Sequence, residues 1–280
     1  MERLLIIDGS ALLFQSFYGM PKKILNNKGE YVEAVICFVG ILFKTIRILK
    51  PNKLLIVFDG ENKLERQDIN PEYKANRATF DFVEEKDNPF CQLEIIKKVL
   101  SKLNFTWIET TNCEADDLIA SVVNDYKQSY EMVISTNDKD FYQLIDKNVS
   151  VFTYRGKVSK LWTEKEIIDK YGFSAKYFAT FKALFGDKTD NINGINGFGE
   201  KTTSKLIQMY GNLTNIYSNV DKLEKRIKEL LKLYKTLVFN NYKIIELHSK
   251  SNLFKLPPCN YILNDEVSSI QVLKQLNVLN

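Results

Sequence analysis

The first half of the chain alternates short apolar runs with segments of helical periodicity. Three runs, over 4–8, 54–59 and 132–136, are apolar up to their last residues, and a helical pattern covers 32–49. Apolar strands that lack alternation and are separated by helices predict a parallel sheet covered on both faces. Each run leads into an aspartate, and ligands of such sheets gather beyond the carboxyl ends of the strands. We therefore expect an α/β fold with an acidic edge.

The pattern changes at three later places. The segment 60–89 is polar, mixed in charge and long for a plain loop, which predicts a functional or mobile excursion from the core. Thr163 and Glu166 predict a capping box, after which the chain is expected to be largely helical. Glycines interrupt that helical pattern within 187–203, and 222–248 predicts one or two long basic helices.

Composition excludes several classes of protein. The 280 residues are 45% apolar and 26% charged, as in ordinary folded domains. The longest uncharged apolar run, 34–43, is about half of what a membrane span needs, and the N-terminus leaves no room for a secretory signal before Asp8. The four cysteines lie far apart and His248 is the one histidine, so zinc sites, disulfides and histidine catalysis are not expected. These features predict a protein of the reducing cytoplasm with no membrane partner.

Nine acidic residues fall at the ends of predicted strands and helices or in turns. They are Asp8, Asp59, Glu114, Asp116, Asp117, Asp138, Asp140, Asp187 and Asp190. Any one of them could simply cap a helix or turn, but nine directed to one edge of a sheet fit that explanation poorly. With oxygen donors alone, such a site selects a hard cation, Mg²⁺ or Mn²⁺. Two such ions about 3.5–4 Å apart stabilise the attacking and leaving oxygens in phosphodiester cleavage.

The spacing of three of these acids makes a local prediction. Glu114 and Asp117 are three residues apart and share a helix face, with Asp116 beside them. Their carboxylates repel one another unless a cation lies between them. Cations are available, because setting the nine acids aside leaves 26 Asp and Glu against 39 Lys and Arg. An acidic site in a basic surface suits a nuclease, whose surround must hold phosphates.

Two segments are candidates for binding DNA. Gly197 and Gly199 precede Lys201 where a helix is predicted to begin, a setting that favours a helix–hairpin–helix over a purely structural turn. Glycine allows close backbone approach, and a helix N-terminus offers N–H groups to a phosphate without reading sequence. In the excursion, cations and one ring share a segment: Arg66, Tyr73, Lys74 and Arg77. This combination suits a single-stranded or frayed end, although an ordinary solvated helix face explains it equally well.

The order of these motifs along the chain carries a resemblance. They are DGS at 8–10, FDG at 58–60, Arg66 to Arg77, EADD at 114–117, STNDKD at 135–140 and GDKTDNINGINGFGEKT at 186–202. The series resembles the 5′→3′ exonuclease domain of bacterial DNA polymerase I and, more broadly, the flap-endonuclease superfamily. The match covers nearly the whole chain. Because no polymerase sequence follows, the chain is similar to the stand-alone bacterial 5′→3′ exonucleases.

The resemblance implies a fold and an activity. The implied fold is PIN-like α/β: a core over 1–162 with a mostly parallel sheet flanked by helices, a helical arch at 60–90, and a helical DNA-binding region over 163–280 with the helix–hairpin–helix near 186–209. The implied activity is metal-dependent hydrolysis near 5′ ends of DNA, as a 5′→3′ exonuclease and 5′-flap endonuclease in replication and repair. It would extend to RNA primers on DNA, with a functional link to DNA polymerase and ligase in the nucleoid.

The resemblance also implies roles for individual residues. One Mg²⁺ or Mn²⁺ is expected near Asp8, Asp59, Glu114, Asp116 and Asp117. A second such ion is expected at Asp138, Asp140, Asp187 and Asp190. The expected catalytic residues are Lys74, Arg77 and Asp116. The expected DNA contacts are Arg66, Tyr73, Lys74, Arg77, Gly197, Gly199 and Lys201, with a K⁺ ion at the helix–hairpin–helix.

The sequence departs from the family pattern at a few positions. Gln15 stands where the polymerase I domains carry an arginine, and Asn193 and Asn196 replace prolines of the hairpin loop. Asn137 replaces a usual glycine, an exchange that asparagine tolerates where the backbone is left-handed. Two alternatives stay open. A DNA-binding module with weakened catalysis is favoured by Gln15 alone, and a PIN-type ribonuclease shares the acidic sheet edge but has no use for a helix–hairpin–helix.

Overall fold

The computed structural model describes residues 1–60, 65–75, 80, 83–249, 254–263 and 268–279. Its centre is a six-stranded sheet in the order β3-β2-β1-β4-β5-β6. The strands are β1 (Glu2–Asp8), β2 (Lys53–Phe58), β3 (Thr106–Glu109), β4 (Tyr130–Ser135), β5 (Val149–Thr153) and β6 (Lys160–Trp162). The first five run parallel, and β6 pairs antiparallel with β5. The predicted mostly parallel sheet is therefore confirmed.

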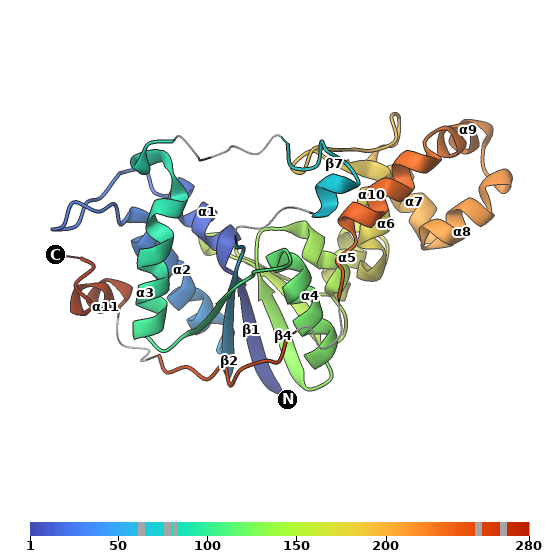
Figure 1. The fold of residues 1–280 in the computed structure, drawn as a ribbon. Helices are drawn as coiled ribbons and strands as arrows, with labels where there is room; N and C mark the ends of the chain where they lie inside the picture. The colour runs from blue at the N-terminus through green and yellow to red at the C-terminus, as the bar shows by residue number, and fades with distance from the viewer. Residues whose placement is uncertain (61–64, 76–79, 81–82, 250–253, 264–267, 280) are drawn as a thin grey trace.

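Helices cover both faces of this sheet (Figure 1). On one side lie α1 (Gly9–Gly19), α2 (Glu33–Leu49) and α3 (Leu93–Lys102), packed on Leu5, Ile7, Leu54 and Ile56. On the other side α4 (Ala115–Tyr126) and part of the C-terminal region pack on Leu4, Ile6, Leu55 and Val57. Because successive side chains of a strand point to opposite faces, strands buried on both faces have no polar alternation. The uninterrupted apolar runs of the sequence have this cause.

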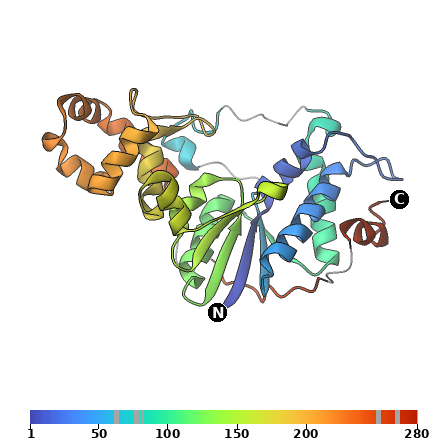
Figure 2. The same cartoon turned by 180° about the vertical axis from the view of Figure 1, so that it is seen from behind.

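The C-terminal region is almost wholly helical and projects to one side of the sheet (Figure 2). It contains α5 (Glu164–Tyr171), α6 (Phe178–Phe185), the two-stranded pair β7 (Gly186–Asp187) and β8 (Ile192–Asn193), α7 (Glu200–Tyr210), α8 (Leu213–Ser218), α9 (Lys225–Leu233) and α10 (Lys235–Ile245). The predicted capping box at Thr163 and Glu166 starts α5. The basic stretch 222–248 forms two helices, α9 and α10.

Short 3-10 helices connect these elements. They are η1 (Glu65–Asp68), η2 (Glu85–Asp87), η3 (Pro89–Gln92), η4 (Lys139–Leu144), η5 (Gly156–Val158), η6 (Ala175–Tyr177) and η7 (Val220–Lys222). Within the described part of 60–90 the helical turns are of this short type. The first described part of this excursion, 65–75, contacts the C-terminal region, since the Lys74 N–H donates to the Asp190 carbonyl over 3.0 Å. Its last part contacts α1 through Phe80 and Phe90, whose rings lie 6.0 and 5.5 Å from that of Phe14.

The end of the chain returns to the α/β core (Figure 1). The Leu54 N–H donates to the Cys259 carbonyl over 2.9 Å, and the Tyr261 hydroxyl donates to the Pro51 carbonyl over 2.6 Å. Helix α11 (Ser269–Gln275) then packs on α2 with Leu273 fully buried. Among the described helices, none combines the length and apolar character that crossing a bilayer would require.

Candidate active site

The carboxyl ends of β1 and β2 carry the first two aspartates of the site. Asp8 ends β1 and caps α1: its Oδ1 accepts from the Ala11 N–H over 2.9 Å, and its Oδ2 accepts from the Thr136 hydroxyl over 2.7 Å. Asp59 follows β2, and its Oδ1 accepts from the Ala115 N–H over 2.8 Å. Asp8 is buried, whereas Asp59 is exposed. Asp8 therefore links β1 to α1 and to the turn after β4, and Asp59 links β2 to the start of α4.

Asp116 and Asp138 face the same place. The pKa of Asp8 is raised to about 7. Burial is the main cause, and the nearby charges of Asp59 and Asp138 add to it, against the hydrogen bonds from Ala11 and Thr136. Burial also raises the pKa of Asp116 well above its ordinary value, with contributions from Asp138, Asp59 and Asp8. Mutual repulsion of this kind marks one electrostatic cluster. We call Asp8, Asp59, Asp116 and Asp138 the central cluster.

A second group of carboxylates lies where the core meets the C-terminal region. Ligand oxygens of Asp140, Asp187 and Asp190 lie within 4.8 Å of one another, and we call these residues the lateral cluster. Asp140 is on η4, Asp187 is on β7, and Asp190 lies in the turn before β8. Oxygen donors at this spacing match the ligand chemistry of Mg²⁺ or Mn²⁺.

Glu114 and Asp117 are held by cations of the excursion. Arg66 places Nη1 2.9 Å from Glu114 Oε1 and Nη2 2.6 Å from Asp117 Oδ1, and Lys74 Nζ lies 2.9 Å from Glu114 Oε2. Burial would raise the pKa of Glu114, but Lys74 and Arg66 together hold it below its ordinary value. The His248 N–H also donates to Asp117 over 2.9 Å. The cation expected between Glu114 and Asp117 is thus Arg66.

The DNA contacts expected in the excursion have different surroundings in the structure. Lys74 has a left-handed backbone with φ 57°, and its ammonium lies 4.8 Å from the centre of the Tyr73 ring. Tyr73 itself is 4% exposed and packs in the hydrophobic core. In this conformation it acts as a buried anchor, and a stacking role for it stays a prediction. Arg77 lies outside the described residues.

The predicted helix–hairpin–helix is formed by α6, the β7–β8 pair and α7. Gly197 has φ +91°, a backbone that favours glycine, whereas Gly199 caps α7 with an ordinary backbone. Gly199 and Lys201 are both exposed, while Phe198, between Gly197 and Gly199, is buried and fixes the loop. This leaves the backbone N–H groups at the start of α7 on the surface, where a phosphate could reach them.

Gln15 makes a polar link beneath the active site. Its Nε2 donates to the Tyr154 carbonyl over 2.9 Å, and its Oε1 accepts from Asn137 Nδ2 over 2.8 Å. Gln15 therefore ties α1 to the turn that positions Asp138. Asn137 has no positive φ, so the asparagine in place of glycine needs no left-handed backbone here.

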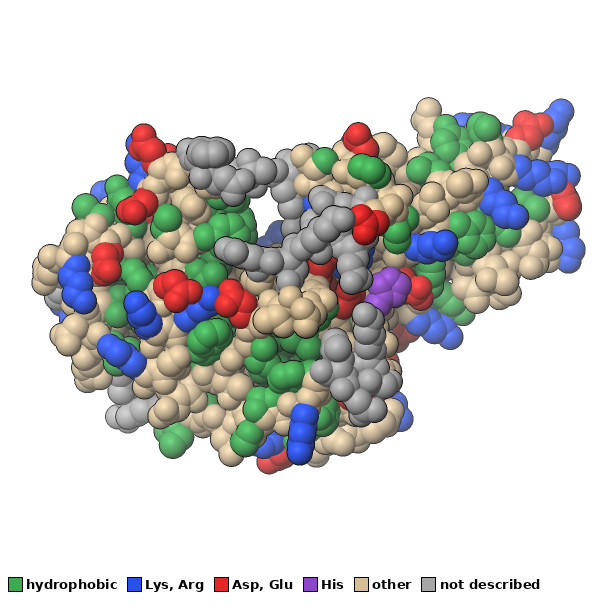
Figure 3. Space-filling view, in the orientation of Figure 1, with side chains coloured by type: hydrophobic (Ala, Val, Ile, Leu, Met, Phe, Trp, Pro, Cys, Tyr) green, Lys and Arg blue, Asp and Glu red, His purple; other side chains and the backbone are tan. Residues whose placement is uncertain are grey.

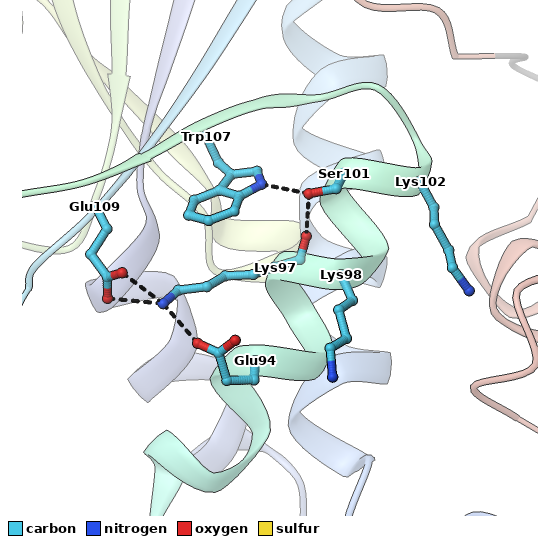
Figure 4. Close-up of a pocket in the computed structure, with 7 residues that line it drawn as sticks. All are labelled: Glu94, Lys97, Lys98, Ser101, Lys102, Trp107 and Glu109. Carbon is cyan, nitrogen blue, oxygen red and sulfur yellow. Dashed lines mark hydrogen bonds and ion pairs between the residues drawn. The ribbon is translucent and has the colours of Figure 1, made fainter.

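Two of the cavities lined by described residues differ in their relation to the site. One of about 210 Å³ borders Arg66, Glu114, Asp117 and His248 and so adjoins the site. A larger hollow of about 510 Å³ lies between α3 and the edge strand β3 (Figure 4). Its buried Lys97 lies between Glu94 and Glu109, at 2.9 and 2.8 Å. Because this lysine is already neutralised and the carboxylate clusters lie elsewhere, the larger hollow is separate from the candidate active site.

Exposed positive charge also gathers on the C-terminal region. In Figure 3, Lys and Arg side chains lie over the α8–α9 end of this region. The exposed cations of α9 include Lys225, Arg226 and Lys232. An exposed basic surface of this kind provides electrostatic attraction for a polyanion.

Sequence reasoning missed one residue of the site, Lys182. It lies on α6, is 6% exposed, and its ammonium contacts both Asp140 and Asp187. Burial alone would lower the pKa of Lys182, but the surrounding aspartates raise it above its ordinary value. A signal was present, since Lys182 is the lone charge in the otherwise apolar FATFKALF segment just before Gly186 and Asp187.

The fold and the acidic edge define a class: α/β proteins that gather carboxylates at the sheet edge to hold divalent cations. Within it, this chain belongs to the 5′-3′ exonuclease family. The model of the N-terminal resolvase-like domain of that family matches residues 3–172, and the model of its C-terminal SAM fold matches 173–260. The family and the nuclease fold expected from the sequence are confirmed, whereas the domain boundary at 162 and 163 stays a prediction.

Several relatives and structures are similar to the chain. The 5′-3′ exonuclease of Aquifex aeolicus is 31% identical over 254 residues, which are 89% of this chain and 83% of the relative. DNA polymerase I of Caldicellulosiruptor bescii is 36% identical over 242 residues, but the chain spans only 28% of its length. T5 5′-exonuclease with divalent metal ions (zinc) bound has a TM-score of 0.68 at 23% identity, over 88% of this chain and 89% of that one. The catalytic core of Rad2 with a DNA substrate has a TM-score of 0.61 at 16% identity, over 98% and 92%.

Proposed function

We propose that this protein is a metal-dependent 5′→3′ exonuclease and 5′-flap endonuclease that hydrolyses phosphodiester bonds of DNA near 5′ ends. The observation that carries the proposal is the gathering of carboxylates with cations beside them. The central and lateral clusters supply oxygen ligands. Arg66 and Lys74 pair with Glu114, two residues from Asp116 of the central cluster. Family membership and the nuclease relatives support the same activity.

The central and lateral clusters are the proposed holders of two Mg²⁺ or Mn²⁺ ions. Their donors are all oxygen, and the exposed Asp59 leaves the central cluster open to solvent and substrate. When bound, two such ions stabilise charge on the attacking and leaving oxygens of a phosphodiester. Glu114 and Asp117 are already paired with Arg66 and Lys74, so we assign them to positioning these cations.

Lys74 is the proposed electrostatic contact to the scissile phosphate. Burial and the neighbouring acids raise the pKa of Asp116, and the charge of Lys74 opposes that rise. Lys74 therefore also lies close enough to act on a phosphate held at Asp116. The left-handed backbone at Lys74 and the bond from its N–H to Asp190 fix the base of this side chain. We expect Arg77 to assist, as the family resemblance implies.

The test uses a duplex with a 5′ flap labelled at the flap end, incubated with Mg²⁺, with Mn²⁺ and with EDTA. Short labelled products that require the metal would support a structure-dependent 5′ nuclease. Binding without cleavage under either ion would favour the DNA-binding module. A parallel substrate with an RNA strand paired to DNA tests primer removal, and faster cleavage of free RNA than of DNA would favour a ribonuclease.

Finer parts of the proposal concern the cellular setting. A K⁺ ion at the carbonyls of the hairpin loop would order that loop for phosphate binding. The polymerase I relatives support a functional link to DNA synthesis, and we extend the proposal to ligation and to a place in the cytoplasmic nucleoid. Cleavage assayed with K⁺ replaced by Li⁺ tests the monovalent ion.

A further inference from the structure

The lateral cluster already contains a cation of the protein's own. The ammonium of Lys182 contacts Asp140 Oδ1 and Asp187 Oδ2. These two carboxylates, together with Asp190, have ligand oxygens within 4.8 Å of one another. The ammonium therefore bridges two of the three carboxylates of the lateral cluster.

This position is costly unless the charge is compensated. Lys182 is 6% exposed, and its neighbours on α6, Phe181, Ala183 and Leu184, are buried in the core. A buried ammonium is stable only when it is paired, and the carboxylates of Asp140 and Asp187 provide the pairing. Conversely, Asp140, Asp187 and Asp190 would repel one another without it. The lysine and the lateral cluster stabilise each other in the absence of any other cation.

Local structure fixes this arrangement. Helix α6 ends at Phe185, and Gly186 turns the chain with φ +90° so that Asp187 lies back beside Lys182. A Cβ atom on Gly186 would lie 2.5 Å from the Gly194 nitrogen, so the turn admits glycine alone. The ammonium is thereby anchored by the same turn that supplies one of the metal ligands.

We propose that Lys182 is the internal counter-ion of the lateral cluster: it preserves the cluster without metal, and it competes with the divalent ion for Asp140 and Asp187, which makes this site the weaker of the two. The inference rests on the proposed function, because that function requires two ions. Lys182 acts through the two aspartates and is therefore a positioning residue. A weak second site would make cleavage depend on the free Mg²⁺ concentration.

The test measures metal binding without DNA and without turnover. Mn²⁺ is titrated into the full chain and followed by electron paramagnetic resonance of the free ion, and thermal unfolding is recorded in EDTA and in Mn²⁺. The variants are Lys182→Met, which removes the charge at similar volume, and Lys182→Gln, which removes the charge but can still donate hydrogen bonds. Lys98→Met, at an exposed lysine of α3, is the matched control.

For the wild-type chain and Lys98→Met we expect one tight and one weaker Mn²⁺. In both Lys182 variants the weaker Mn²⁺ should bind at least about tenfold more tightly, because a like charge that contacts two of the proposed ligands of the ion has been removed. The EDTA-treated variants should unfold at a lower temperature, and Mn²⁺ should raise that temperature by more than it does in wild type.

Other outcomes separate this inference from the proposed function. The counter-ion role would be overturned if wild type binds two Mn²⁺ and folded Lys182→Gln binds the second Mn²⁺ with unchanged or lower affinity. A lower affinity would mean that the lysine assembles the site. If Lys182→Met does not fold, Lys182→Gln decides between these results. A wild-type chain that binds no Mn²⁺ would contradict the proposed function and this inference with it.

Discussion

Asp116 connects the chemistry of the site to a single side chain. Its charge interacts with those of Asp138, Lys74, Asp59 and Asp8, so it belongs to the central cluster rather than to the Arg66 pairing beside it. Replacing Asp116 by Asn should lower the cleavage rate by more than about a hundredfold, since even outer-shell partners of metal ligands contribute about 10–100-fold. DNA binding should change little, because the phosphate contacts that we propose are made by other residues.

The measurement compares single-turnover cleavage with DNA affinity in EDTA for the same protein. Asp169→Asn, at an exposed aspartate of α5, removes the same charge far from the cluster and should leave both quantities unchanged. An equal loss of affinity and rate in Asp116→Asn would contradict the role assigned to Asp116.

The buried acids also predict how stability depends on pH. Burial, with the charges of neighbouring acids, raises the pKa of Asp8 to about 7 and that of Asp140 to about 7, the latter in spite of the opposing Lys182 charge; an ordinary aspartate has 3.8. Between these values the folded chain holds protons that the unfolded chain has released. The stability from these groups is therefore fully present below about pH 4 and is lost as the pH rises through about 7.

Thermal unfolding at a series of pH values, in EDTA and in Mg²⁺, checks this dependence. In EDTA the acids of the two clusters should contribute a fall in the free energy of unfolding as the pH rises to about 7. Saturating Mg²⁺ should offset the fall, because the ion favours the ionised carboxylates. An EDTA profile in which stability rises over that range, with no larger Mg²⁺ effect at higher pH, would contradict the assignment.

At the scale of elements, the hairpin between α6 and α7 combines a structural glycine with a surface glycine. A Cβ atom at Gly194 would lie 2.1 Å from the Phe185 carbonyl oxygen, whereas at Gly199 it would meet no atom within 4 Å. Gly194→Ala should therefore destabilise the fold by about 2 kcal/mol or more. Gly199→Ala should stay within about 0.5 kcal/mol of wild type but weaken DNA binding, since its Cβ would obstruct a phosphate approaching the N-terminus of α7.

Denaturant unfolding and DNA affinity, measured on both variants, separate the two effects. Equal stabilities would mean that the turn at Gly194 is less constrained than its contacts indicate. Unchanged DNA affinity in Gly199→Ala would place the phosphate contact elsewhere on α7, for example at Lys201.

At the scale of the whole molecule, helix α11 packs on α2, on the side of the sheet opposite α4. Leu273 of α11 is fully buried against the core built on α2, whereas Ile270 on the same helix is 42% exposed. Leu273→Ala should cost about 2–5 kcal/mol of unfolding free energy. Ile270→Ala should stay within about 0.5 kcal/mol, and chemical denaturation of both variants gives the comparison. Similar values for the two variants would mean that α11 is not part of the core.

Much of this protein is determined by local sequence. The apolar runs predict the strands, because a strand buried on both faces has no polar alternation, and each run leads to an acid at the sheet edge. The three-residue spacing of Glu114 and Asp117 likewise predicts a shared face and a cation between them. These inferences hold because backbone periodicity fixes the direction of a side chain within its own element.

Only the tertiary structure decided which partners meet across elements. It placed Arg66 on Glu114 and Asp117, buried Tyr73 in the core, and brought Lys182 from α6 to the aspartates of η4 and β7. None of these contacts has a fixed spacing in the sequence, since each depends on how separate elements pack. The same packing divides the nine acids into a central cluster of four, a lateral cluster of three, and the pair Glu114 and Asp117 held by Arg66 and Lys74. A carboxylate's neighbours in space decide its charge and which ligand it can hold.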